Sequence, residues 1–335
     1  MKIPGNVMRI SFCYLAAVSI LLVTMFLAIS YGAKEMTLGT VYSAIFRYDP
    51  SVTAHQIIHD LRLPRVFGAA LVGAALAVAG ALMQGITRNP LADTGIFGIN
   101  AGSACMVAVS FAFLPGLSYS WLMLLSFAGA AAACLIITAL AALSAGGMTS
   151  LRLTVAGTVM ASILSSVSSG IAIYFDLNQD LAFWYAGGVA GVTWEHLRVL
   201  SPVIVLTLLG TVALGRPLSF LALGEESAAS LGVEIGRIRL LGMAAVVILA
   251  GSAVSVAGSI SFVGLAVPHI VRKLAGVDYR NIIGLSALLG PVLLLWADFG
   301  ARMINPPREL AIGILVAIVG VPFFLYLARQ ERREL

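Results

Sequence analysis

Charged residues are scarce in this 335-residue chain. They make up 10% of it, whereas a soluble domain carries about 25%. Hydrophobic residues make up 60%, so the chain has too little polar surface to cover itself in water. This excludes a soluble globular enzyme, a disordered protein and a nucleic-acid-binding protein, despite the formal net charge of +5. The composition predicts an integral membrane protein along almost the whole length.

Motifs of catalysis and metal binding are also missing. The sequence contains no GxxxxGK[ST] phosphate loop and no HExxH, CxxC or GxSxG pattern. The three cysteines, Cys13, Cys105 and Cys134, lie in apolar segments and are interpreted as small buried side chains. His55 and His59 could share a helix face, but only Asp60 is nearby, which favours exposed polar residues over a metal site. We expect no enzyme activity, no cofactor and no metal.

Uncharged runs between the charged residues predict ten membrane spans, because one bilayer-crossing helix needs about 20 apolar residues. Six runs have the length of one span: 10–33, 66–87, 153–175, 199–215, 281–297 and 310–328. The longer runs, 94–151 and 240–271, each divide in two, near Pro115 and near the glycine-rich segment 258–264. The predicted fold is therefore an all-α polytopic bundle that forms a single domain over 1–335, with the first span retained rather than cleaved.

Lysine and arginine set the orientation of such a bundle. With the N-terminus inside, ten spans return the C-terminus inside, and 13 of the 20 basic residues then lie on the cytoplasmic side. The reverse orientation breaks the positive-inside rule. The sequence thus predicts an exterior loop over 34–64 and a large cytoplasmic loop over 216–239.

Two similar segments indicate an internal repeat. Residues 71–82 read LVGAALAVAGAL and residues 249–260 read LAGSAVSVAGSI, with six of twelve positions identical at an offset of 178 that also superposes Pro90 on Pro268. The segments fall in the second and seventh spans, which cross in opposite directions. This predicts an inverted repeat of spans 2–5 and 7–10, as in many transport proteins. Two similar small-residue packing faces are the alternative.

Carboxylates in mid-membrane would indicate an ion-coupled carrier. Asp93, Asp176 and Asp298 all lie at predicted span ends. This argues against a secondary transporter, which remains the alternative function, and implies that a partner supplies the energy.

Six motifs follow one another between residues 60 and 328. They are Leu61-Arg62-Leu63-Pro64-Arg65, Gly80-x3-Gln84-x4-Asn89-Pro90-Leu91-Ala92, Gly224-Glu225-x2-Ala228-x2-Leu231-Gly232, Phe262-Val263-Gly264-Leu265-x2-Pro268-His269-x2-Arg272, Ala297-Asp298-x3-Arg302 and Pro307-Arg308-Glu309-Leu310-x-Ile312-Gly313. In this order and spacing they resemble the FecCD-type permeases, the membrane subunits of ABC importers for ferric siderophores, haem and vitamin B12. Ala311 departs from the family, which often has proline at that position.

The resemblance implies a set of partners. Two permease subunits, identical or paralogous, would surround a central path in the cytoplasmic membrane of a bacterium or archaeon, in contact with membrane lipid. Two ABC ATPase subunits would dock on the cytoplasmic side, and an extracytoplasmic binding protein (a lipoprotein or a periplasmic protein) would deliver substrate. An iron(III)-siderophore chelate is the preferred substrate, with cobalamin or haem as alternatives, and no nucleic acid is involved.

The resemblance also implies site residues. Gly224, Glu225, Ala228, Leu231 and Gly232 match the helix that couples to the ATPase, Thr149 and Ser150 match a cytoplasmic gate, and Arg62, Arg65 and Arg302 match arginines that dock the binding protein.

The residues themselves leave alternatives for each of these sites. Residues 227–231 can form a short connector helix with small residues exposed, Leu231 buried and Gly232 as C-cap. Thr149 or Ser150 suits a helix N-cap. The arginines suit carboxylate partners, or they anchor helices, with Arg302 pairing Asp298 four residues earlier.

Four serines of the fifth predicted span lie three to four residues apart. They are Ser162, Ser165, Ser166 and Ser169. Such a stripe can line a weakly interacting path or pack helices together, and we expect packing.

Overall fold

The structure is a computed structural model that describes residues 4–32, 36–143, 150–306 and 308–331, and every regular element within them is helical. Ten helices match the predicted spans: α1 (Pro4–Ser30), α4 (Leu63–Thr87), α5 (Ile99–Phe113), α6 (Tyr119–Leu143), α7 (Ser150–Tyr174), α9 (Trp194–Val212), α12 (Ile235–Ala257), α13 (Val263–Ala275), α14 (Tyr279–Met303) and α15 (Ile312–Glu331). Seven of them are long and apolar enough to cross a membrane alone, whereas α5, α13 and the apolar part of α15 are shorter. The all-α polytopic fold is confirmed.

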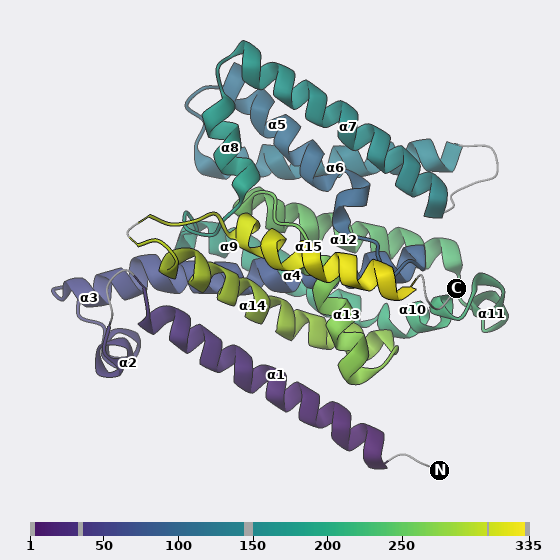
Figure 1. Cartoon of the computed structure of the whole chain (residues 1–335), viewed down its shortest axis with the longest axis horizontal. Helices are drawn as coiled ribbons and strands as arrows, with labels where there is room; N and C mark the ends of the chain where they lie inside the picture. The colour runs from purple at the N-terminus through teal and green to yellow at the C-terminus, as the bar shows by residue number, and fades with distance from the viewer. Residues whose placement is uncertain (1–3, 33–35, 144–149, 307, 332–335) are drawn as a thin grey trace.

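Short helices occupy the two ends of the bundle (Figure 1). They are α2 (Leu38–Phe46), α3 (Thr53–Gln56), the π-helical turn η1 (Ile57–Arg62), the 3-10 turn η2 (Thr94–Phe97), α8 (Asn178–Ala186), α10 (Gly215–Ala222) and α11 (Glu225–Ser230). Helices α2 and α3 lie at one end, and α10 and α11 lie at the other, where both chain termini are also found. This arrangement agrees with an even number of crossings.

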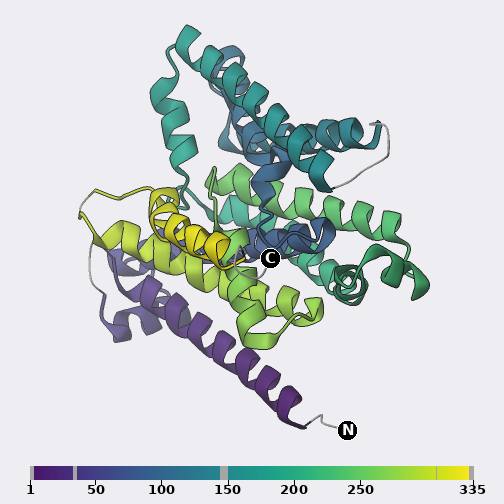
Figure 2. The same ribbon diagram turned by 45° about the vertical axis from the view of Figure 1, so that its right-hand side comes forward.

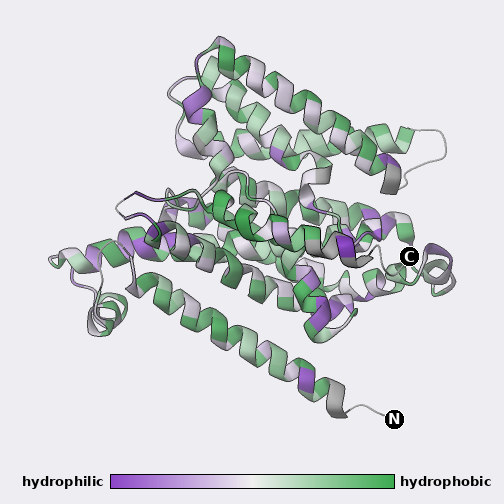
Figure 3. Ribbon diagram, in the orientation of Figure 1, coloured by the Kyte–Doolittle hydropathy of each residue, from purple (hydrophilic) through white to green (hydrophobic). Residues whose placement is uncertain are grey.

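Most residues along the helices are hydrophobic, and hydrophilic residues gather mainly near the helix ends and in the connections (Figure 3). Helices α5 to α8 form a group set apart from α1, with α4, α12 and α14 between them, in both orientations (Figures 1 and 2). Because many large apolar side chains are exposed on the outside of the bundle, burial of apolar area alone does not hold such helices together. Close van der Waals packing has to contribute.

Helix α4 is the centre of the bundle, and 20 of its residues are buried. It contacts α1, α9, α12, α13 and α14. A helix that is hydrophobic on all sides is expected to be surrounded by others, and the alanine- and glycine-rich sequence of α4 lets its neighbours approach closely.

Pairs of glycines mark the closest crossings, and they lie at Gly73 with Gly290 (α4 and α14), Gly80 with Gly264 (α4 and α13) and Gly102 with Gly129 (α5 and α6). A Cβ atom on Gly73, Gly80 or Gly102 would overlap the backbone carbonyl oxygen of its partner. No rotamer change can relieve an overlap with backbone, so these positions require glycine.

The helices repeat in length and in contact pattern. Helices α4 to α7 have 25, 15, 25 and 25 residues, and α12 to α15 have 23, 13, 25 and 20. The α4–α14 and α4–α13 contacts correspond to α12–α6 and α12–α5. The repeat therefore relates four helices to four helices.

The alignment of Pro90 with Pro268 is wrong. Pro90 lies in the connection between α4 and α5, whereas Pro268 lies inside α13. The reason is that the first connection is longer and contains η2, while the second spans only 258–262. A single offset cannot align both halves across connections of unequal length.

Candidate functional site

An ionic network joins α4, α14 and the α14–α15 connection at the end of the bundle where α2 and α3 lie. The Arg65 guanidinium donates from Nε to Asp298 Oδ1 at 2.9 Å, and its Nη2 lies 2.8 Å from the same oxygen. Its Nη1 and Nη2 donate to the two carboxylate oxygens of Glu309 at 3.0 and 2.9 Å. The Asp298 side chain is fully buried, Arg65 is 13% exposed and Glu309 is 42% exposed.

Arg302 extends this network to α1. Its Nε lies 3.1 Å from Asp298 Oδ2, one helical turn earlier. Its Nη1 donates to the carbonyl oxygens of Ala28 and Tyr31 at 3.2 and 3.1 Å. The last carbonyls of a helix have no partner within it and carry partial negative charge, so this cation satisfies the C-terminal end of α1.

Arg62 binds the same end of α1 from the adjacent helix. Its Nη1 donates to the carbonyl oxygens of Ile29 and Ser30 at 2.6 and 3.0 Å. The π-helical turn η1 ends at Arg62, two residues before Pro64 in the first turn of α4. Gly32 follows α1, and a Cβ there would lie 3.2 Å from Arg62 Nη2 and 3.4 Å from Arg302 Nη1, so glycine leaves room for both guanidinium groups.

The three arginines predicted to dock a binding protein are thus brought together, and each already has partners in this chain. The Arg302–Asp298 pair expected as the alternative is present. A docking role would require an exchange of partners, and it stays a prediction. Glu309 belongs to the Arg308-Glu309-Leu310 part of the last family motif, but no local pattern in the sequence predicts its pairing with Arg65.

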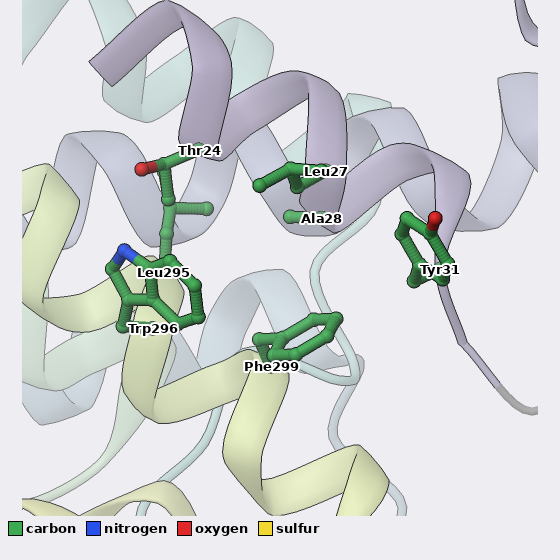
Figure 4. Close-up of a pocket in the computed structure, with 7 residues that line it drawn as sticks. All are labelled: Thr24, Leu27, Ala28, Tyr31, Leu295, Trp296 and Phe299. Carbon is green, nitrogen blue, oxygen red and sulfur yellow. The ribbon is translucent and has the colours of Figure 1, made fainter. Parts of the chain in front are cut away.

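A small apolar pocket of about 120 Å³ lies between α1 and α14 beside this network (Figure 4). It is lined by Thr24, Leu27, Ala28, Tyr31, Leu295, Trp296 and Phe299. Ala28 and Tyr31 also provide carbonyls to Arg302. The pocket is far too small for a metal chelate. Side chains of α1 and α14 therefore do not pack tightly here, and polar contacts to Arg302 hold the end of α1 in place.

The predicted cytoplasmic loop, residues 216–239, contains α11, and the exposed face of this helix differs from the prediction. Ala228 is fully buried, whereas Leu231 is 57% exposed. The expectation that Leu231 is buried is therefore wrong. Ala228 lies on the face that contacts the rest of the loop, which leaves Leu231 as an apolar side chain on the surface.

Gly232 closes α11 as predicted, with a positive φ of 79°. The Gly232 N–H donates to the Ala229 carbonyl at 2.9 Å, and the Val233 N–H donates to the Ala228 carbonyl at 3.0 Å, which is the Schellman pattern. At the other end, the Glu225 carboxylate pairs with Arg239 at 2.6 Å. The short helix is thus fixed to α12 at its start and closed at its end.

Helix α10 is tied to the first turn of α14. Ser219 Oγ donates to Asp278 Oδ1 at 3.2 Å and accepts from the Tyr279 N–H at 2.8 Å. Hydrogen bonds from Arg280 hold the pKa of the Asp278 carboxyl below its ordinary value. Asp278 stays ionised near neutral pH, where it caps α14 and links that helix to the α10–α11 segment.

The gate prediction falls at the edge of the described residues. Thr149 lies outside them, and Ser150 is the first residue of α7.

Further along α7, the serines at 162, 165, 166 and 169 are all exposed. Ser162 and Ser166 donate to the carbonyls of Thr158 and Ser162 at 2.9 Å. The expectation that these serines pack helices together is not met within this chain, because they form an outward hydroxyl stripe. Within the described part of the chain, no three His, Cys, Asp or Glu side chains are grouped so that they could hold a metal ion.

Comparisons with known proteins agree with this architecture. A model of the FecCD transport family matches residues 20–330. The iron(3+)-hydroxamate import system permease protein FhuB of Bacillus subtilis is 51% identical over 323 residues, which are 96% of this chain and 84% of the relative. The ferric enterobactin transport system permease protein FepD of Escherichia coli is 36% identical, and 94% of each chain is covered.

A solved structure has a similar fold. An inward-facing metal-chelate type ABC transporter matches with a TM-score of 0.83 and 28% identity, covering 95% of this chain and 98% of the other. The helices, their order and the sequence match extend over nearly the full length. This chain is therefore a multi-pass membrane protein that belongs to the FecCD transport family.

Proposed function

We propose that this chain is the permease subunit of an ABC importer that moves iron(III)-siderophore chelates, with hydroxamates first among them, across the cytoplasmic membrane of a bacterium. The observation that carries the proposal is the 51% identity to an iron(3+)-hydroxamate import permease over almost the whole chain. The chain itself has no phosphate-binding loop, so separate ATPase subunits supply the energy. Two permeases, two ATPases and an extracytoplasmic binding protein form the complete importer.

The hydroxyl stripe of α7 supports a path between two permease subunits. Lipid offers no hydrogen-bond partner to an outward row of serines, although back-bonding to the helix satisfies part of the stripe. A path that must release a large chelate needs weak polar contacts rather than fixed charges. In this proposal α7 faces the path, and Thr149 and Ser150 lie at its cytoplasmic gate.

Iron uptake into proteoliposomes tests the substrate. The permease complex is reconstituted with its ATPase and binding protein, and uptake of a radiolabelled ferric hydroxamate is compared with uptake of cobalamin and haem. We expect ATP-dependent ferric hydroxamate uptake that persists when ionophores remove the ion gradients. Uptake of cobalamin or haem alone would overturn the iron assignment, and uptake driven by an ion gradient without ATP would overturn the ABC assignment.

The exposed side of α11 is the proposed contact with the ATPase. Replacing Leu231 by arginine introduces a charge where an apolar side chain enters the partner's groove. A central interface residue contributes about 2 kcal/mol or more, so we expect the affinity for the ATPase to fall about 30-fold, with loss of transport. Co-purification of the ATPase with the solubilised permease measures this effect.

Arg237→Ala is the matched control, because Arg237 is an exposed residue of the same loop outside α11, with only a long 3.9 Å contact to Glu234. We expect it to retain the ATPase. Equal retention by the Leu231 and Arg237 variants would contradict a coupling role for α11.

A further inference from the structure

Arg65 makes two carboxylate contacts of different character. Asp298 binds it from the buried side, through Nε and Nη2. Glu309 binds it from the exposed side, through a fork of Nη1 and Nη2. The first contact fixes the orientation of the guanidinium, and the second covers the edge that faces outward.

That outward edge is the edge a docking protein would need. A guanidinium binds a carboxylate most strongly through two parallel N–H donors, and Glu309 occupies both donors on this side. Asp298 uses Nε and Nη2, so no second free fork is left on Arg65. A carboxylate from another protein can form the same fork only after Glu309 has moved away.

The position of Glu309 favours its displacement from Arg65. It lies in the connection between α14 and α15, outside any helix, and its side chain is 42% exposed. The adjacent Leu310 N–H donates to the Ala301 carbonyl at 3.0 Å, which keeps the connection close to α14. A docking carboxylate would form the same two-donor fork, so the exchange replaces one bidentate pair by another and leaves no donor of Arg65 unpaired.

We propose that Glu309 is an internal competitor of the binding protein: it occupies Arg65 in the undocked permease, and a carboxylate of the binding protein displaces it on docking. This rests on the docking role proposed for the exterior arginines. Arg65 then keeps its buried pair with Asp298 throughout, and its outward fork has a carboxylate partner both before and after docking. The competition lowers the docking affinity and so helps the emptied binding protein to leave.

Binding measurements on the reconstituted importer test the exchange. The probe is the purified binding protein that supports uptake through this permease, and its affinity is measured by surface plasmon resonance on nanodiscs that hold the permease with its ATPase. Removing the competitor with Glu309→Gln frees the fork, and we expect affinity to rise about three- to tenfold.

Arg65→Lys keeps the charge and the contact with Asp298 but loses the fork, so we expect it to weaken binding. In the variant that combines Arg65→Lys with Glu309→Gln, the second change should no longer raise the affinity for the binding protein, because both changes act on the same fork of Arg65.

Asp60→Asn is the matched control for net charge. Asp60 is an acid on the same face of the membrane with its side chain 59% exposed, and it pairs with His59 rather than with an arginine. Loss of the Asp60 charge should leave the affinity for the binding protein within about twofold of the parent value, because a charge at the rim of an interface has little effect at physiological salt.

Each other outcome overturns the proposal in a distinguishable way. If Arg65→Lys weakens binding but Glu309→Gln does not tighten it, docking on Arg65 stands and competition by Glu309 is wrong. If Arg65→Lys has no effect, docking on Arg65 is itself wrong. If Asp60→Asn tightens binding as much as Glu309→Gln, the gain reflects general charge and not the release of Arg65.

Discussion

Replacing Gly80 by alanine is expected to prevent stable folding of the permease. The added methyl group would overlap the carbonyl oxygen and Cα of Gly264, where α4 crosses α13. Overpacking against side chains costs about 1–3 kcal/mol. Here the obstacle is backbone, so we expect about 3 kcal/mol or more, because α4 and α13 would have to separate along their whole contact.

Gly170→Ala is the matched control. Gly170 lies in α7, another predicted span, and a Cβ there meets no other atom within 4 Å. Alanine is the better helix former by about 1 kcal/mol, so this variant should be as stable as the parent or slightly more so. Thermal unfolding of the detergent-solubilised proteins, followed by size-exclusion chromatography, compares the two. Equal unfolding temperatures would show that the α4–α13 contact is looser than described.

Asp298→Ala is expected to be the most destabilising change among the ionisable residues. Asp298 is fully buried and forms ion pairs with both Arg65 and Arg302. Removing one partner of a buried ion pair costs about 3–5 kcal/mol, because an uncompensated charge remains. We expect a large fall in unfolding temperature, with α1 released first, since Arg302 connects it to α14.

Glu309→Gln provides the contrast for this prediction. It removes the charge of the partly exposed partner of Arg65 and leaves Asp298 in place, so we expect a smaller loss of stability, about 1–2 kcal/mol. Thermal unfolding of both variants at neutral pH separates the two roles. If both changes lower stability equally, the buried and exposed carboxylates do not differ as the geometry indicates.

The spans were predictable because their ends are marked along the chain itself. Charged residues flank most of the apolar runs, and the structure places the corresponding helices where those runs lie. The Arg302–Asp298 pair was also predictable, since residues four apart share a helix face.

The other contacts depend on residues far apart in the sequence. Arg65 and Glu309 are 244 positions apart, and no local pattern brings them together. The face of α11 was misjudged for a different reason. A helix of six residues is too short for a hydrophobic period to show which side is buried, so Leu231 and Ala228 could not be told apart. The Gly80–Gly264 crossing could not be predicted from the sequence either. Only the tertiary arrangement distinguishes these two glycines, which face backbone, from Gly170, which does not.

The end of α1 has a consequence for the order of assembly. Its last carbonyls are bound first by Arg62, which is synthesised soon after, and then by Arg302, which belongs to the penultimate span. The first helix to enter the membrane therefore receives its final contact only when nearly all of the chain has been made. Until then the C-terminal end of α1 is held by Arg62, while Arg9 near its start donates to the Lys273 and Leu274 carbonyls at the end of α13. The C-terminal part of the protein thus completes the fixing of the N-terminal helix, and a chain truncated before residue 302 would lack the cation that joins the end of α1 to α14.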